Sequence, residues 1–170
     1  SRIGFVGTPC QIRAIRRLES GKLGKGKLAK SCELKLGLFC METFDYNALM
    51  GYLKEQGIDP NNVHKFEIKK GKFIAHRICE PDFEVKISKL KILMRDCCKT
   101  CTDYTSEFAD ISIGNIGSPD GWSTVITRTP LGEASLINAN KNDLIDIQSI
   151  PGGAGIDLLK KLAEDKKKRS

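Results

Sequence analysis

The sequence predicts an α+β fold: a mixed sheet with two strand-to-helix units, an antiparallel β-hairpin region and a C-terminal helix. Two apolar runs near the N-terminus are each followed by a stretch with helical spacing of its apolar residues. Alternating segments flank a Lys-Lys-Gly-Lys turn in the middle of the chain, which indicates a hairpin. At 170 residues, the chain can bury a core without disulfides or metal.

The first strand-to-helix unit occupies residues 2–20. Residues 2–6 predict a buried strand, and the following stretch predicts a helix that Gly21 ends. Thr8 and Gln11 form a capping box, with Pro9 at the first helical position. Cys10 therefore falls in the first turn, where free N–H groups and the helix dipole favour a thiolate.

The second unit repeats this pattern. Residues 34–39 alternate as in a strand, Cys40 follows at once, and residues 45–55 have helical spacing with Gly57 after them. If the two strands lie side by side, both thiol-bearing turns come to the carboxyl edge of one sheet. Open α/β sheets hold their sites at that edge.

The rest of the chain predicts mostly strands, with no internal repeat and no clear domain linker. A helix from about Ile156 to Lys168 should close the fold. The expected strands are 63–68 and 73–78 around Gly71, then 83–87, 109–114, 122–129, 135–139 and 144–150.

The net charge of +7 is concentrated in residues 21–30 and in the tail 166–169. Without these eight bases, 20 basic residues face 21 acidic ones. We expect both segments to be solvated and flexible rather than a nucleic-acid surface, because no aromatic residues interleave with the lysines. No apolar run is long enough to span a membrane and no signal peptide is visible, so we expect a cytoplasmic protein.

Seven cysteines, an odd number without secretory context, argue against a disulfide framework. Cys98-Lys-Thr-Cys101 is a single C-x-x-C, and no helix is predicted after it, which fits a redox pair poorly. His64 and His76 lie on a polar face and are interpreted as surface residues. One C-x-x-C and two lone cysteines at strand–helix turns offer four thiolates, the number that a 4Fe–4S cluster binds. Zinc, or no metal at all, remains an alternative on spacing alone.

A glycine-rich loop, NIGSPDG, follows the strand predicted at 109–114. Its glycines allow close backbone approach to a ligand, its serines add donors, and Trp122 offers a flat aromatic face. A tight turn with a buried tryptophan is the alternative. The residues concerned are Gly114, Asn115, Gly117, Ser118, Gly121, Trp122 and Ser123.

Three stretches, VGTPCQIRAIRRL, LGLFCMETF and CKTCTDYTSEFADISIGNIGSPDGWSTVITRTPLGEA, closely resemble the beta-subunit family of coenzyme F420-reducing hydrogenase. That family includes the beta subunit of the deazaflavin-dependent formate dehydrogenase. The resemblance implies that residues 1–170 are the C-terminal domain of such a subunit, with the upstream half absent. It implies FAD, a 4Fe–4S cluster, hydride exchange with coenzyme F420, and partner subunits of a hydrogenase or formate dehydrogenase complex.

Carried over residue by residue, the resemblance implies Cys10, Cys40, Cys98 and Cys101 as cluster ligands. Cys97 is expected not to bind, and Cys32 and Cys79 are interpreted as incidental. The flavin contacts expected from the loop are Gly114, Asn115, Gly117, Ser118, Trp122 and Ser123, although many relatives should carry an acid in place of Asn115. No catalytic acid or base is identified. The alternatives are a zinc-stabilised interaction module and a basic nucleic-acid-binding domain. The fragment alone is expected to bind FAD weakly and not to reduce the deazaflavin.

Overall fold

The computed structural model describes residues 2–20, 31–150 and 152–169. The chain forms two compact units, one from Ser1–Met41 with Cys101–Ser170 and the other from Glu42–Thr100. We call them the split unit and the middle unit. The sequence showed no linker between them.

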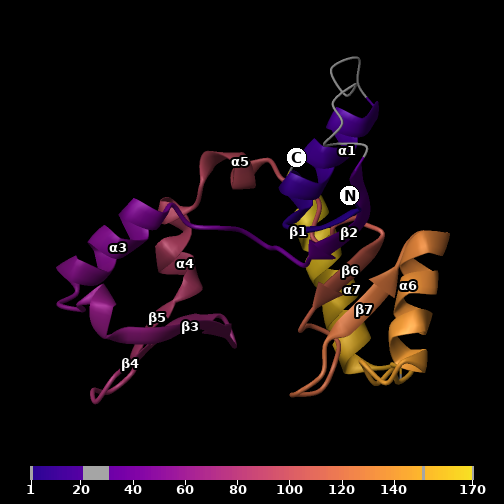
Figure 1. The fold of residues 1–170 in the computed structure, drawn as a ribbon. Helices are drawn as coiled ribbons and strands as arrows, with labels where there is room; N and C mark the ends of the chain where they lie inside the picture. The colour runs from indigo at the N-terminus through magenta and orange to yellow at the C-terminus, as the bar shows by residue number, and fades with distance from the viewer. Residues whose placement is uncertain (1, 21–30, 151, 170) are drawn as a thin grey trace. The chain divides into compact units, whose positions relative to one another are not determined.

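A four-stranded sheet forms the centre of the split unit (Figure 1). Its order is β1-β2-β6-β7, with β1, β2 and β6 parallel and β7 antiparallel to β6. The mixed sheet and its two N-terminal strands are therefore confirmed, but β1 is not the buried strand that was predicted, because Ile3 and Val6 are exposed. The strands are β1 (Ile3–Gly7), β2 (Cys32–Leu38), β6 (Ile111–Gly114) and β7 (Thr124–Thr127).

The helix α1 (Pro9–Ser20) begins as its capping residues predict. The Thr8 N–H donates to Gln11 Oε1 at 2.8 Å, which is one half of the capping box. Ile12 of its apolar stripe is fully buried. The predicted helix end at Gly21 lies outside the described residues.

Two predicted strands are wrong. Residues 135–139 belong to the helix α6 (Pro130–Lys141), where Thr129 Oγ1 accepts a hydrogen bond from the Gly132 N–H at 3.1 Å. Thr129-Pro130 is the same helix-start signal as Thr8-Pro9, and it outweighs the strand-like run of apolar residues. Residues 144–150 form no regular element and pair with no strand, and Leu144, Ile145 and Ile147 are exposed. The predicted C-terminal helix is confirmed as α7 (Ala154–Lys167).

The middle unit has its own sheet and its own apolar core. The antiparallel hairpin of β3 (Val63–Lys69) and β4 (Lys72–Arg77) turns at Gly71 as expected, and β5 (Phe83–Lys86) pairs with β4. The predicted second helix is α3 (Tyr46–Glu55), and Asp45 caps it. Short elements complete the unit: η1 (Pro60–Asn62), α4 (Ile87–Leu90), η2 (Lys91–Leu93) and α5 (Asp96–Lys99). The core contains Leu53, Ile58, Phe73, Ala75 and Leu90.

None of the helices in the described residues has both the length and the apolar character needed to cross a membrane.

Candidate cofactor site

The carboxyl edge of the split unit's sheet gathers several of the predicted site residues. In the register of β1 and β2, Gly7 is paired with Gly37. Cys10 and Cys40 each follow that pair by three residues, so the two thiol-bearing turns leave the sheet at the same edge. β6 is parallel to β2 and ends at Gly114, so the glycine-rich loop starts at this edge as well.

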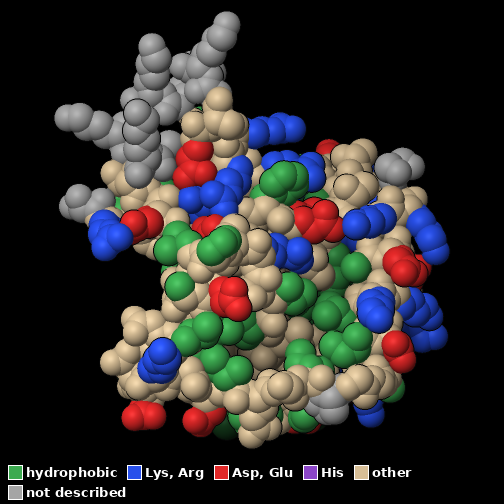
Figure 2. Space-filling view, turned by 90° about the vertical axis from the view of Figure 1, so that its right-hand side faces the viewer, with side chains coloured by type: hydrophobic (Ala, Val, Ile, Leu, Met, Phe, Trp, Pro, Cys, Tyr) green, Lys and Arg blue, Asp and Glu red, His purple; other side chains and the backbone are tan. Residues whose placement is uncertain are grey.

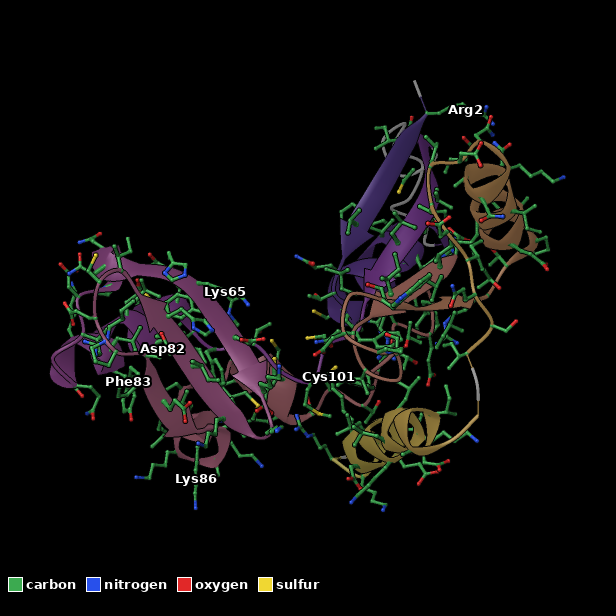
Figure 3. The ribbon with its side chains drawn as sticks, turned by 90° about the horizontal axis from the view of Figure 1, so that it is seen from below. Arg2, Lys65, Asp82, Phe83, Lys86 and Cys101 are labelled. Atoms are coloured by element: carbon green, nitrogen blue, oxygen red, sulfur yellow. The ribbon has the colours of Figure 1, made fainter. Side chains whose placement is uncertain are left out.

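The three predicted ligand thiols in the split unit differ in exposure. Cys10 is exposed in the first turn of α1, with its Sγ 3.2 Å from Thr8 Oγ1. Cys40 is half-buried, and its N–H donates to the Tyr104 carbonyl at 2.9 Å. Cys101 (Figure 3) is half-buried too, and its Sγ lies 3.7 Å from the Asp103 carbonyl oxygen.

Tyr104 links the Cys40 and Cys101 segments. Burial raises the pKa of Tyr104, and the negative charge of the nearby Cys40 thiolate raises it further. The Tyr104 ring packs against Phe39 with centroids 5.7 Å apart. The rings of Tyr104 and Phe39 therefore pack together beside the Cys40 turn.

The fourth predicted ligand, Cys98, belongs to the middle unit, where it lies in α5. Its side chain is buried, and its Sγ is 3.4 Å from Thr43 Oγ1. The adjacent Cys97 is exposed. Cys97 and Cys98 are adjacent in the sequence, but only Cys98 is buried.

Within the described parts of the chain, no three His, Cys, Asp or Glu side chains are arranged to hold a metal ion. In a 4Fe–4S cluster each thiolate binds a different iron, so the ligand sulfurs stand farther apart than around one ion. The thiols at the sheet edge are the soft donors that such a cluster requires.

The glycine-rich loop joins β6 to β7 and is partly explained by packing. A Cβ atom on Gly114 would lie 2.0 Å from the Phe39 ring, so close packing requires a glycine there. Gly117 has φ +104° and lies against α7. The Ser118 hydroxyl donates to the Trp122 carbonyl at 3.0 Å and holds the loop closed. As flavin contacts, these residues and Asn115 stay predictions.

Trp122 and Ser123 do face an open space. They help to line an apolar cavity of about 460 Å³ between β7, α6 and residues 145–150. Trp122 is 38% exposed, so it is not buried, although its N–H donates to the Pro119 carbonyl at 3.1 Å in a tight turn. Hydrophobic side chains are visible on this α6 side of the molecule in Figure 2. The other lining residues include Val125, Leu136, Ile145, Ile147 and Ile150.

The helix α7 passes across the carboxyl edge, at the opposite end of the sheet from Arg2 (Figure 3). Its first turn packs on the glycine-rich loop, since a Cβ on Gly155 would lie 2.6 Å from the Gly117 carbonyl oxygen. At its other end, Lys166 donates to the Cys40 carbonyl and Arg169 donates to the Met41 carbonyl at 3.2 Å.

The expectation of a solvated, flexible tail is wrong for Lys166, which is 1% exposed. Sequence reasoning missed this residue because it treated 166–169 as one charged run. A signal was present: Lys166 stands seven residues after the buried Leu159, which places both on the same face of α7. Lys167 is exposed, and its ammonium forms an ion pair with Glu107 at 2.9 Å.

Comparison with known proteins shows the family to which the chain belongs. The family model for the C terminus of the coenzyme F420 hydrogenase/dehydrogenase beta subunit matches residues 1–152. The chain belongs to this family. The resemblance found in the sequence is therefore confirmed, and α7 lies beyond the part that the family model covers.

The sequence similarity to named relatives covers nearly the whole chain. It is 38% identical to the coenzyme F420 hydrogenase subunit beta of Methanococcus voltae, over 99% of this chain and 60% of that protein. It is 34% identical to the coenzyme F420-dependent sulfite reductase of Methanocaldococcus jannaschii, over 99% of this chain and 27% of that protein. The chain thus spans well under two thirds of these family members.

A solved structure of the same family confirms the α+β fold. A chain of the F420-reducing NiFe hydrogenase complex from Methanosarcina barkeri matches with a TM-score of 0.91 at 33% identity. The match covers 99% of this chain and 58% of that one.

Proposed function

We propose that the chain works in an oxidoreductase subunit that relays electrons between a 4Fe–4S cluster, FAD and coenzyme F420. The observation that carries this proposal is the family match over residues 1–152. Relatives named as F420 hydrogenase subunit, F420-dependent sulfite reductase and F420H2 dehydrogenase subunit have only the coenzyme in common. The shared module is therefore the part best suited to serve coenzyme F420, with the other redox partner supplied by further subunits or domains.

The residues at the carboxyl edge fit the cluster part of the relay. Cys10, Cys40 and Cys101 of the split unit and Cys98 of the middle unit would be the four thiolate ligands. Backbone hydrogen bonds orient this edge, since the Cys40 N–H donates to Tyr104 and its carbonyl accepts from Lys166. Burial and such hydrogen bonds are the means by which a protein sets the potential of a cluster.

The cavity beside Trp122 fits the flavin part. Its apolar lining would exclude water from one face of a ring, and Trp122 would supply a flat surface for stacking. A flavin, when bound, exchanges hydride with a deazaflavin and single electrons with a cluster. This chain alone should hold FAD weakly, because one wall leaves most of a ligand in water while working sites bury 70–90% of it, as a rough rule.

The test uses the complete subunit, purified without oxygen. We expect iron and acid-labile sulfide in equal amounts, bound FAD, and reduction of coenzyme F420 with an artificial electron donor. Zinc in place of iron, or iron and flavin without any turnover of coenzyme F420, would overturn the proposal. The nucleic-acid alternative has lost part of its basis, because Lys166 and Arg169 of the basic tail are bonded to the fold.

A further inference from the structure

Lys166 is a buried lysine, and no carboxylate among the described residues forms an ion pair with it. Its side chain is 1% exposed, and its ammonium donates to the neutral carbonyl of Cys40. Among the described residues, no carboxylate forms an ion pair with it, whereas the neighbouring Lys167 and Lys168 pair with Glu107 and Asp165. A buried charge without a counter-charge is costly, so such groups are normally paired or bind a charged group.

The position of the Lys166 ammonium indicates which negatively charged group would balance it. The Cys40 carbonyl and the Cys40 thiol belong to one residue, so the ammonium lies beside a proposed cluster ligand. A 4Fe–4S cluster with four thiolates carries net negative charge, and its one-electron reduction adds another without breaking a bond. A positive charge held nearby therefore stabilises the reduced cluster more than the oxidised one.

The geometry of α7 fixes this charge in place. Gly155 packs against the Gly117 carbonyl at one end of the helix, while Lys166 and Arg169 bind two successive carbonyls, those of Cys40 and Met41, at the other. The last turn of α7 thus clamps the Cys40 turn from outside the part of the chain that the family model covers.

We propose that Lys166 is a positioning residue for the cluster: it holds the Cys40 turn and its charge favours cluster reduction. This inference rests on the proposed function, because it requires a cluster at Cys40. At an effective dielectric constant of about 20, one unit charge about 10 Å away changes a one-electron equilibrium constant by roughly tenfold.

The test measures the midpoint potential of the cluster by spectroscopically monitored redox titration of the complete subunit. Four proteins are compared: the native chain, Lys166→Gln, Lys166→Arg and Lys160→Met. Gln keeps a donor for the Cys40 carbonyl without the charge, Arg keeps the charge, and Lys160 is an exposed lysine of the same helix. We expect Lys166→Gln to lower the reduction equilibrium constant about tenfold, which corresponds to ~59 mV for one electron. Lys166→Arg and Lys160→Met should stay within about twofold of the native protein.

Each outcome for the Lys166 variants either supports or overturns the positioning role. If Lys166→Gln assembles no cluster although circular dichroism shows it folded, and Lys166→Arg restores the cluster, the positioning role is supported. If Lys166→Gln does not fold, Lys166→Arg decides alone, because native iron content and potential support the inference and loss of either overturns it. An unchanged potential in Lys166→Gln overturns it while leaving the proposed function intact. A native subunit without iron and sulfide overturns the proposed function itself.

Discussion

The two compact units differ in where they place polar groups. The split unit buries Lys35, Asp110, Ser112 and Lys166 inside or at the end of a largely parallel sheet. The middle unit, built from the continuous segment 42–100, buries an apolar cluster and keeps its charged side chains outside that core. Buried charges add little net stability, and their positions in the split unit differ: Lys35 and Asp110 lie where β2 meets the start of β6, whereas Lys166 bonds the Cys40 carbonyl at the carboxyl edge.

Among the predicted ligands, the middle unit supplies only Cys98, so the first test removes that contribution. In the complete subunit purified without oxygen, Cys98→Ser should abolish cluster assembly, while Cys97→Ser should leave it intact. The physical reason is that Cys98 is buried in α5 whereas Cys97 faces outward. Visible absorption of the thiolate–iron bands, with iron and sulfide analysis, is the measurement. Equal behaviour of the two variants would contradict the ligand assignment.

The largest stability effect should come from Asp110 in the split unit. Its carboxylate accepts hydrogen bonds from the Lys35 N–H at 2.8 Å, the Thr129 hydroxyl at 2.9 Å and Arg16 at 2.8 Å. Asp110→Ala removes the acceptor of the buried Lys35 N–H and of the partly buried Thr129 and Arg16 side chains, and should cost about 3–5 kcal/mol of unfolding free energy. Denaturant unfolding measures the loss, and Asp120→Ala in an exposed position is the control. A loss below about 1 kcal/mol would show that water replaces the carboxylate.

The same carboxylate predicts a pH dependence. Burial tends to raise the pKa of Asp110, but the hydrogen bonds from Lys35, Thr129 and Arg16 outweigh it and hold the pKa below its ordinary value. A depressed pKa means that the stabilisation is complete above the unfolded value of about 3.9 and is lost as the pH falls through the folded pKa. Hydrogen exchange of β2 and β6 amides should therefore become faster relative to the intrinsic rate on acidification.

A smaller effect is expected where α7 meets the glycine-rich loop. Gly155→Ala would place a methyl group 2.6 Å from the Gly117 carbonyl oxygen, and both partners are backbone. Overpacking of this kind costs about 1–3 kcal/mol. Faster amide exchange throughout α7 is the expected result. Gly152→Ala, with nothing within 4 Å of its Cβ, is the matched control, and equal exchange in both variants would show that α7 does not depend on this contact.

Local signals predicted much of the fold. Capping residues at Thr8 and Gln11, alternation around Gly71, and the two strand-to-helix turns all indicated elements that the structure contains. The glycine-rich loop and two of the cysteine turns predicted from the motifs start at one edge of the sheet in the structure, while their role as a cofactor site stays a prediction. These features depend on residues close together in the chain, which is why the sequence reveals them.

The failures came from contacts between distant segments. The Arg16–Asp110 pair joins residues 94 apart, and the Lys166 bond to Cys40 spans 126. Neither contact can be predicted from local sequence patterns, because the whole sheet, and not local periodicity, brings the two residues together. The apolar run at 135–139 was misread for a related reason, since the decisive helix start at Thr129-Pro130 lies outside the run itself.

The smallest effect is expected in the middle unit and should have the opposite sign with pH. His76, predicted as a plain surface residue, is half-buried between two carboxylates: its Nδ1 is 2.8 Å from Asp82 and its Nε2 is 3.1 Å from Glu67. Lys65 forms an ion pair with Glu67, and the His64 ring lies 6.0 Å from the His76 ring. Figure 3 shows Lys65 and Asp82 on this three-stranded part of the molecule.

The hydrogen bond with Glu67 raises the pKa of His76 despite the opposing effect of burial, and Asp82 adds to the rise. A raised pKa means that the stabilisation is complete below the unfolded value of about 6.5 and is lost as the pH rises through the folded pKa. Amides of β3 and β4 should therefore exchange faster relative to the intrinsic rate at about pH 8.5 than at about pH 5.5, whereas β2 and β6 should show no such loss over that range. His76→Gln should remove the dependence in the middle unit, since the amide cannot carry the charge. If the dependence persists in His76→Gln, another group of that unit, and not this imidazole between two carboxylates, is responsible for it.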